Sequence, residues 1–210
     1  FAALRGLSTH SGNPTEASRP WDKNRDGFIL SDGAAIVVLE ELEHALNRGA
    51  NILAEVKGFA MNADAHHITQ PGGGGAVKCM QNACEDAKIS TKNIDHINPH
   101  ATSTPVGDEK EAMAINTVLG EHASNVTVSA TKSMTGHLLG AAGALETIIS
   151  ALIIREQTVP ATINCKDPED YINFNLIRDK TIKQNVNTIL NLSLGFGGTN
   201  ACLILSKHNA

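Results

Sequence analysis

Residues 138–154 form a long run that carries a single charged side chain, Glu146. A helix built from such a run either spans a membrane or lies in the core of a large domain. Glu146 would cost about 2.5 kcal/mol or more near the middle of a bilayer, and neither flank has a lysine–arginine cluster or an aromatic belt. We therefore predict a buried helix from His137 to about Arg155, covered by other elements on all sides.

The rest of the chain alternates β-branched stretches with amphipathic ones. Strands are predicted at 33–41, 51–62, 94–100 and 125–131, with two more inside 187–207 joined by the glycine-rich turn 195–200. Helices are predicted at 42–49, 76–89 and 107–120, with a flexible glycine run at 71–75. Strands that alternate with helices and end in a hairpin indicate an α/β layered domain. Because no repeat or linker interrupts the pattern, we expect residues 1–210 to form a single domain.

Charge and cysteine content narrow the function. A net charge of −5 argues against a nucleic-acid binder, which needs a basic stripe. The four cysteines are scattered without metal-binding spacing, which is typical of a reducing compartment, so we expect a cytoplasmic protein. Residues 1–10 lack an initiating methionine and do not form a signal peptide, and they have the composition of a helix interior. We expect this chain to be cut from a longer one.

Two histidines occupy matching places in the predicted elements. His100 follows a strand in NPHATSTPVGD, and His137 begins the apolar helix in KSMTGHLLGAAG. The dipole and free N–H groups of a helix start disfavour positive charge, so an imidazole there stays neutral and can donate to a developing oxyanion. Each histidine taken alone is better explained as a structural residue. The polar residues after His100 and the glycines of 195–200, which let a backbone approach a ligand, favour a site.

Four stretches together carry a family resemblance. KSMTGHLLGAAGA, HATSTPVGD, GFGGTN and SRPWDKNRDGF resemble the β-ketoacyl-acyl-carrier-protein synthases, in particular the synthase II type of bacterial fatty-acid synthesis. The resemblance implies a thiolase-like fold, in which two similar α/β halves pack as a layered α/β/α/β/α sandwich, usually in a dimer. This chain resembles the C-terminal half with a piece of the preceding region.

The resemblance also implies a chemistry. In this family a cysteine takes the acyl chain from the carrier protein, and malonyl-carrier protein then loses carbon dioxide and attacks the acyl thioester. His100 and His137 match the two histidines of the decarboxylation. Lys132 matches a lysine behind them, in a network with acids that match Asp108, Glu111 and Glu146. An ordinary buried ion pair is the alternative explanation of Lys132 and Glu146, because a buried lysine must be paired.

Further positions match residues around the substrate. Thr102 and Thr104 match residues that hydrogen-bond the phosphopantetheine arm, which the acyl carrier protein carries, so no cofactor of the enzyme itself is implied. Phe196 matches a gating phenylalanine whose swing admits the acyl chain. Arg5 matches a position that contacts the acidic carrier protein, and a solvated surface charge explains it equally well.

Three departures from the family pattern stand out. Pro99 and Ala101 replace alanine and glycine beside His100, and Ala101 fits only if its φ is negative. Leu192 replaces an asparagine that, with positions matching Asn98 and Glu146, binds a structural cation in some relatives, so we expect no metal. None of the cysteines lies in the small-residue elbow of the family nucleophile, so we expect this chain alone to be inactive.

Two rival functions remain open on the sequence. A non-catalytic partner that resembles a chain-length factor would keep the fold and form heterodimers, but it would not need His100, His137 and Lys132. A polyketide ketosynthase is the other alternative, although SRPWDKNRDGF fits the fatty-acid type. The first hypothesis is a C-terminal portion of a 3-oxoacyl-acyl-carrier-protein synthase, homodimeric when full-length, with acyl carrier protein as partner and no nucleic acid or membrane.

Overall fold

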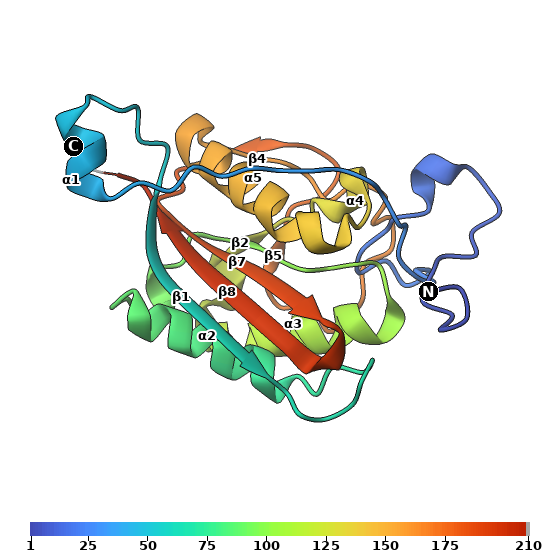
Figure 1. Cartoon of the computed structure of the whole chain (residues 1–210). Helices are drawn as coiled ribbons and strands as arrows, with labels where there is room; N and C mark the ends of the chain where they lie inside the picture. The colour runs from blue at the N-terminus through green and yellow to red at the C-terminus, as the bar shows by residue number, and fades with distance from the viewer. Residues whose placement is uncertain (209–210) are drawn as a thin grey trace.

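The computed structural model describes residues 1–208 and has a mixed sheet with helices on both faces (Figure 1). Six strands pair in the order β1-β8-β7-β2-β3-β5. They are β1 (Glu55–Ala63), β2 (His96–Asn98), β3 (Thr127–Val128), β5 (Asn175–Leu176), β7 (Thr188–Gly195) and β8 (Thr199–Ser206). β7, β2, β3 and β5 run parallel, whereas β8 is antiparallel to both β1 and β7. A separate antiparallel pair joins β4 (Thr158–Val159) to β6 (Ile182–Lys183).

Helices cover the sheet from two sides (Figure 1). α2 (Gly74–Asp86) and α3 (Pro105–Leu119) lie on one face, and α4 (Lys132–Thr135) and α5 (Ala142–Glu156) lie on the other. α1 (Leu42–Asn47) stands away from the sheet at one end of the molecule. Short 3₁₀ turns occupy Pro14–Glu16, Thr91–Asn93, Gly120–Asn125, Leu139–Ala141 and Phe196–Gly198.

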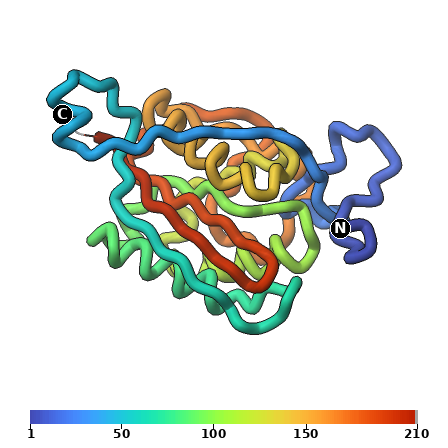
Figure 2. Tube along the Cα trace, in the orientation of Figure 1, coloured from blue at the N-terminus to red at the C-terminus, as the bar shows by residue number. Residues whose placement is uncertain are grey.

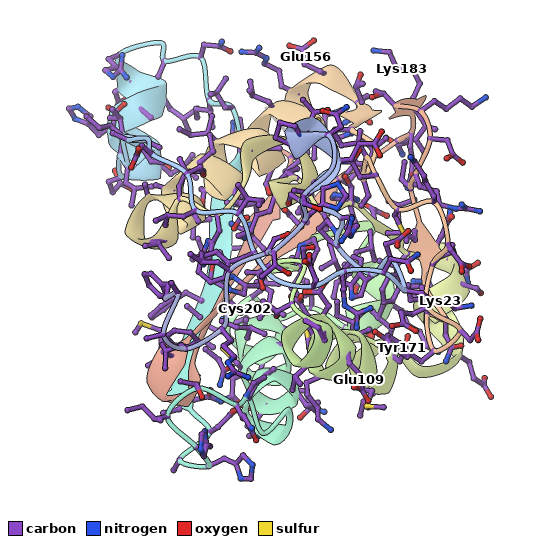
Figure 3. The ribbon with its side chains drawn as sticks, turned by 90° about the vertical axis from the view of Figure 1, so that its right-hand side faces the viewer. Lys23, Glu109, Glu156, Tyr171, Lys183 and Cys202 are labelled. Carbon is purple, nitrogen blue, oxygen red and sulfur yellow. The ribbon has the colours of Figure 1, made fainter. Side chains whose placement is uncertain are left out.

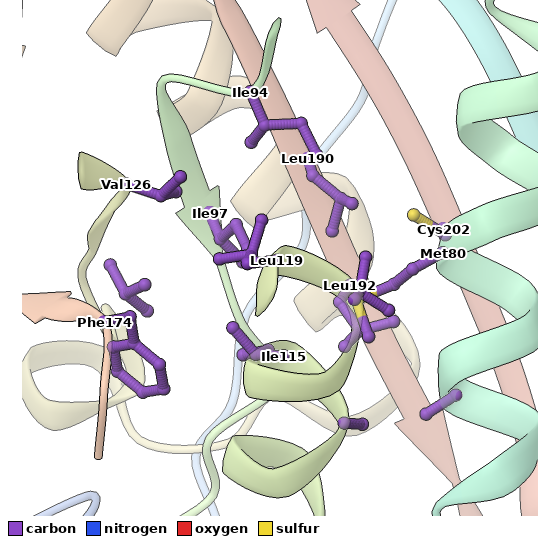
Figure 4. Packing of buried hydrophobic residues seen from close by; sticks show 14 of the residues in the cluster. Met80, Ile94, Ile97, Ile115, Leu119, Val126, Phe174, Leu190, Leu192 and Cys202 are labelled. Atoms are coloured by element: carbon purple, nitrogen blue, oxygen red, sulfur yellow. The ribbon is translucent and has the colours of Figure 1, made fainter. Parts of the chain in front are cut away.

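The core fills the space between the sheet and the helices. Ile97, Leu190 and Leu192 of the strands pack with Met80 of α2 and Ile115 of α3 in the larger cluster (Figure 4). A smaller cluster lies between α5 and the opposite face of the sheet. Both clusters involve the central strands, whose residues are buried because helices cover both faces of the sheet.

The prediction of a strand at 33–41 is wrong. Residues 31–41 run as an extended chain across the molecule to α1 without pairing with any strand of residues 1–208 (Figures 1 and 2). The side chains of Ile36 and Val38 are 87% and 80% exposed. A β-branched run indicates strand propensity, but a strand also needs a neighbour for its backbone groups. Residues 2–5 likewise form turns where composition suggested a helix.

The helix predicted from His137 starts later than expected. The chain forms the single turn α4, breaks at Gly136, and enters α5 only at Ala142. Gly136 has a φ of +68° and Leu139 one of +53°, and such left-handed residues end a right-handed helix. The expected cover on all sides is also absent within residues 1–208. α5 buries one face, made by Ala142, Glu146, Ser150, Ile153 and Ile154, and most of its other side chains are half-buried.

The other predicted elements are confirmed with shifted ends. β1 begins at Glu55, four residues after the predicted start, and α2 begins inside the glycine run, at Gly74. α3 begins at Pro105, as proline favours the first turn of a helix. The terminal hairpin of β7 and β8 is as expected. Within the described residues, none of the helices has the length and apolar character that crossing a bilayer requires.

Candidate active site

The carboxyl ends of the parallel strands bring the candidate residues together. The segment after β2 carries His100, the segment after β3 leads into α4 with Lys132, and β7 ends at the turn that carries Phe196. In parallel sheets, segments that leave neighbouring strands at the same edge form the usual place for a site. Sequence-distant residues therefore meet at this edge.

His100 and His137 lie against one another as a pair. Their ring centroids are 5.1 Å apart and the rings are nearly perpendicular, at 88°. His137 is held by its backbone, whose N–H donates to the Ile29 carbonyl at 2.7 Å and whose carbonyl accepts from the N–H of Ser31 at 3.1 Å. The ring of Phe28 packs edge-on against His137 at 5.5 Å. The imidazole of His137 is thus fixed by a bridge between distant segments.

Both imidazoles are held neutral. Burial, helped by the charge of Lys132, lowers the pKa of His137 to about 4 and that of His100 well below 6.5. The neutral state of His137 was expected because this residue was predicted to begin a helix. α5 begins only at Ala142, so that reason is wrong. The N–H of Leu139 donates to Nδ1 of His137 at 3.3 Å. The neutral ring then carries its proton on Nε2 as a donor.

Lys132 and Glu146 form a buried ion pair, as expected from the sequence. They are 1% and 2% exposed, and the Lys132 ammonium donates to Oε1 of Glu146. Oε2 of Glu146 has no hydrogen-bond partner among residues 1–208. Burial raises the pKa of the Glu146 carboxyl, and Lys132 opposes that rise. Glu146 thus holds the Lys132 ammonium in a buried position near the two histidines.

Glu111 holds the backbone at His100. Its two carboxyl oxygens accept from the N–H groups of His100 at 2.6 Å and Ala101 at 2.7 Å. Burial raises the pKa of Glu111 to about 8, and the charge of Asp108 adds to the rise. Glu111 therefore fixes the backbone of the His100 segment directly. The charge of Lys132 acts on Glu111 only by lowering its pKa against the rise.

Asp108 differs from its predicted setting. It pairs with Arg25, whose Nε lies 3.6 Å from Oδ2, and it accepts from the backbone N–H groups of Trp21 and Thr104. Burial raises the pKa of Asp108 to about 6 against these lowering contacts. The expected network of one lysine with three acids is thus divided between two cations, Lys132 and Arg25.

Ala101 has the backbone conformation that the sequence argument excluded. Its φ is +28°, and that of Ser103 is +71°. Such values are strained for residues other than glycine and persist only where the surroundings impose them. Here the carboxyl of Glu111 holds Ala101, and the N–H of Gly27 donates to the Ser103 carbonyl at 3.0 Å. With alanine in place of glycine at position 101, the loop keeps this strained conformation.

A cavity of about 760 Å³ opens in front of the histidine pair. Among the residues that line it are eight of the predicted site residues, namely Arg5, His100, Thr102, Thr104, Asp108, Glu111, His137 and Phe196. Lys132 and Glu146 lie behind this lining. The sequence-predicted residues are thus brought to one site, with the ion pair as its support.

Thr102, Thr104 and Phe196 stand at different parts of the cavity. The hydroxyl oxygens of Thr102 and Thr104 are 3.1 Å apart and share a hydrogen bond. Phe196 is 52% exposed in the turn between β7 and β8, and its ring lies 6.1 Å from that of Phe1. The following Gly197 has a φ of +79°. The cavity wall therefore combines two hydrogen-bonded hydroxyl groups with a half-exposed aromatic ring on a tight turn.

Sequence reasoning gave no role to Trp21 and Arg25. Both are buried, and both contact Asp108 at the start of α3. The stretch SRPWDKNRDGF could have indicated this role. Its tryptophan and arginine need hydrogen-bond partners if they are buried.

The four cysteines are buried free thiols, and none of them lines the cavity. Burial raises the pKa of Cys79 and Cys84 to about 11 and that of Cys165 to about 12. A thiol with a raised pKa is a poor nucleophile. Within residues 1–208, no three histidine, cysteine or carboxylate side chains gather in a way that could hold a metal ion.

Comparisons with known proteins show the family of this chain. The family model "Beta-ketoacyl synthase, C-terminal domain" matches residues 53–166, and the model of the N-terminal domain matches residues 1–45. The chain is 51% identical to 3-oxoacyl-[acyl-carrier-protein] synthase 2 of Coxiella burnetii over 99% of its length and 50% of that relative. It is 49% identical to the mitochondrial 3-oxoacyl-[acyl-carrier-protein] synthase of Arabidopsis thaliana, over 46% of that relative.

The similar solved structures are also ketosynthases. A β-ketoacyl synthase from Burkholderia phymatum superposes with a TM-score of 0.95 at 36% identity, covering all of this chain and 51% of that one. A type II polyketide ketosynthase, in complex with its acyl-carrier protein and bound to the hexaketide, gives a TM-score of 0.97 at 36% identity over 52% of its length. The chain spans about half the length of these relatives. It has the thiolase-like fold and belongs to the β-ketoacyl synthase family of acyltransferases.

Proposed function

We propose that this chain is part of a 3-oxoacyl-acyl-carrier-protein synthase, which elongates fatty acyl chains by decarboxylative Claisen condensation with malonyl-carrier protein. The observation that carries the proposal is the pair of neutral histidines, 5.1 Å apart, at a cavity of about 760 Å³. The curated relatives at 49–51% identity support it.

The chemistry follows from the state of the two rings. When the malonyl thioester loses carbon dioxide, the electron pair of the broken C–C bond moves onto the thioester and charges its oxygen. Two neutral N–H donors stabilise this enolate oxygen as its charge develops, in a site with little water. The enolate carbon then attacks the acyl thioester, whose sulfur leaves as the thiolate of a cysteine that we place outside this chain.

The supporting residues have distinct tasks. Glu111 holds the backbone at His100, while burial, helped by the charge of Lys132, keeps both imidazoles neutral. Thr102 and Thr104 offer hydroxyls to the phosphopantetheine arm that the acyl carrier protein brings. Phe196 gates the entry of the acyl chain.

The partners and location belong to the same proposal. Arg5, on the cavity wall, contacts the acidic carrier protein, a role that fits the complex of the related ketosynthase with its acyl-carrier protein. The full-length enzyme forms a homodimer and works in the cytoplasm, where buried free thiols are typical. Residues 1–210 fold as one domain of it, which alone is inactive for lack of the nucleophile.

The rival functions are less well supported. A partner that resembles a chain-length factor has no use for a paired histidine site with a buried lysine behind it. A polyketide ketosynthase is less similar, since the related solved polyketide enzyme is 36% identical and the fatty-acid relatives are 49–51% identical.

The test uses the intact protein that carries both ketoacyl synthase domains. Acylation of the nucleophile and decarboxylation of malonyl-carrier protein are measured separately in His137→Ala and Lys132→Ala. We expect decarboxylation to fall by about 10²–10³-fold in His137→Ala, with acylation less affected in both variants. His44→Ala is the control, because this α1 side chain is 70% exposed. Normal decarboxylation in both variants would refute the assigned roles.

A further inference from the structure

Residues 18–31, here called the strap, hydrogen-bond to three segments of the candidate site. Ser18 donates from its hydroxyl to the Lys132 carbonyl at 2.7 Å. Ile29 and Ser31 hold both backbone groups of His137. The N–H of Gly27 donates to the Ser103 carbonyl at 3.0 Å. The strap therefore touches the lysine, one histidine and the loop of the other histidine.

Arg25 is the most connected side chain of the strap. The side chain is 4% exposed, and its Nε donates to the Thr104 carbonyl at 3.2 Å while Nη2 donates to the Pro105 carbonyl at 2.7 Å. The same guanidinium lies 3.6 Å from the Asp108 carboxylate. These contacts are on the first residues of α3 and the residue before it, immediately after the strained loop that carries His100.

The guanidinium is also anchored to a segment distant from α3 in the sequence. Nη1 donates to Glu169 at 2.5 Å, and Nη2 donates to the hydroxyl of Tyr171 at 3.0 Å. Trp21 of the strap adds two bonds to Asp108, one from its backbone N–H and one from its indole to the Asp108 carbonyl at 2.9 Å. Arg25 thus joins the His100 loop to a second, independent part of the fold.

The His100 loop needs such a support. Ala101 and Ser103 both have positive φ, so the loop is held in a conformation that it would leave if it were free. Five donor groups in a rigid plane make arginine suited to fixing several oxygens at once, which lysine cannot do in the same geometry. Loss of the guanidinium would let the loop relax while leaving the His137 bridge intact.

We propose that Arg25 is a positioning residue, which sets the place of His100 relative to His137 by fixing the start of α3 from the strap. Arg25 is not among the residues that line the cavity. The inference rests on the proposed decarboxylation. A displacement of about 1 Å in such a site costs about 10²-fold in rate, so we expect losses of about 10- to 100-fold.

The experiment measures both half-reactions in the intact two-domain protein with Arg25→Gln and Arg25→Lys. We expect malonyl decarboxylation to fall about 10- to 100-fold in Arg25→Gln, with acylation of the nucleophile within about twofold and partial recovery in Arg25→Lys. Lys23→Ala is the matched control, since Lys23 lies in the same segment but pairs with exposed Asp167 and Asp170. Figure 3 shows Lys23 and Tyr171 toward the same edge of the molecule.

A double-mutant cycle separates positioning from mere stabilisation. We expect the losses in Arg25→Gln and Asp108→Asn to be strongly non-additive in decarboxylation, because the two side chains act on the same loop. Equal loss of both half-reactions, or additive effects, would overturn the proposal. If Arg25→Gln does not fold, Trp21→Phe removes one bond to the same helix start and must show the same selective loss. Failure of the unmodified protein to decarboxylate would instead refute the proposed function.

Discussion

His96 in β2 is a buried histidine outside the candidate site. It is fully buried, its Nδ1 lies 3.0 Å from the Thr127 hydroxyl, and its Nε2 has no partner among residues 1–208. Burial lowers the pKa of His96 to about 3. A histidine with a lowered pKa contributes stability that is present above about pH 6.5 and is lost as the pH falls toward the folded-state pKa.

We therefore expect His96→Leu to make the protein less sensitive to acid. The fall in the thermal unfolding midpoint between pH 7 and pH 4.5 should be smaller in the variant, because it has no buried imidazole to protonate. His66→Leu, at an exposed loop histidine, is the control. An unchanged pH dependence in His96→Leu would show that His96 does not contribute to acid unfolding.

At the scale of elements, the turn between α4 and α5 decides where His137 stands. Gly136 has a φ of +68°, and a Cβ there would lie 3.0 Å from the Ile29 carbonyl oxygen, which accepts the bond from the N–H of His137. Any side chain at this position strains the backbone and crowds the bridge. The turn and the strap together take His137 out of a helix and into the cavity wall.

Gly136→Ala should accordingly displace His137 without removing it. We expect malonyl decarboxylation to fall by about tenfold or more, as for other small displacements in a site, with acylation of the nucleophile less affected. Gly140→Ala is a matched control, because a Cβ at Gly140 meets open space. Unchanged decarboxylation in Gly136→Ala would mean that the bridge to the strap does not position the ring.

At the scale of the whole molecule, the exposed apolar surface is the main feature. Ile36, Val38 and Leu39 are 87%, 80% and 74% exposed in an extended segment, and the outer face of α5 is only half covered. An exposed apolar run with strand propensity associates with other surfaces. This surface fits a chain that spans about half the length of its relatives.

We expect this chain by itself to self-associate and to bind an apolar dye. Sedimentation velocity over a range of concentrations should show the association, and the double variant Ile36→Lys/Val38→Lys should reduce it. Met113→Lys is the control, because Met113 is a 43% exposed residue on α3, away from this segment. A monomer at high concentration without dye binding would contradict the expectation.

The sequence by itself determined the alternation of elements and the terminal hairpin, and it predicted candidate residues of which eight line one cavity. The helical spacing of apolar residues predicted α2, whose apolar residues fall on one buried face, and a glycine-rich turn between two apolar stretches predicted the β7–β8 pair. The histidines and Lys132 were recognised because their neighbouring residues form specific stretches. These features depend on local order along the chain, which a sequence contains.

Only the tertiary structure decided what depends on partners distant in sequence. The β-branched residues of 33–41 are unpaired because pairing depends on a neighbouring strand, which propensity does not report. The sequence likewise did not predict that Asp108 pairs with Arg25 or that His137 pairs with the strap. Each of these contacts joins segments that are far apart in the chain. Burial, which sets the neutral state of both histidines, exists only once those segments have packed.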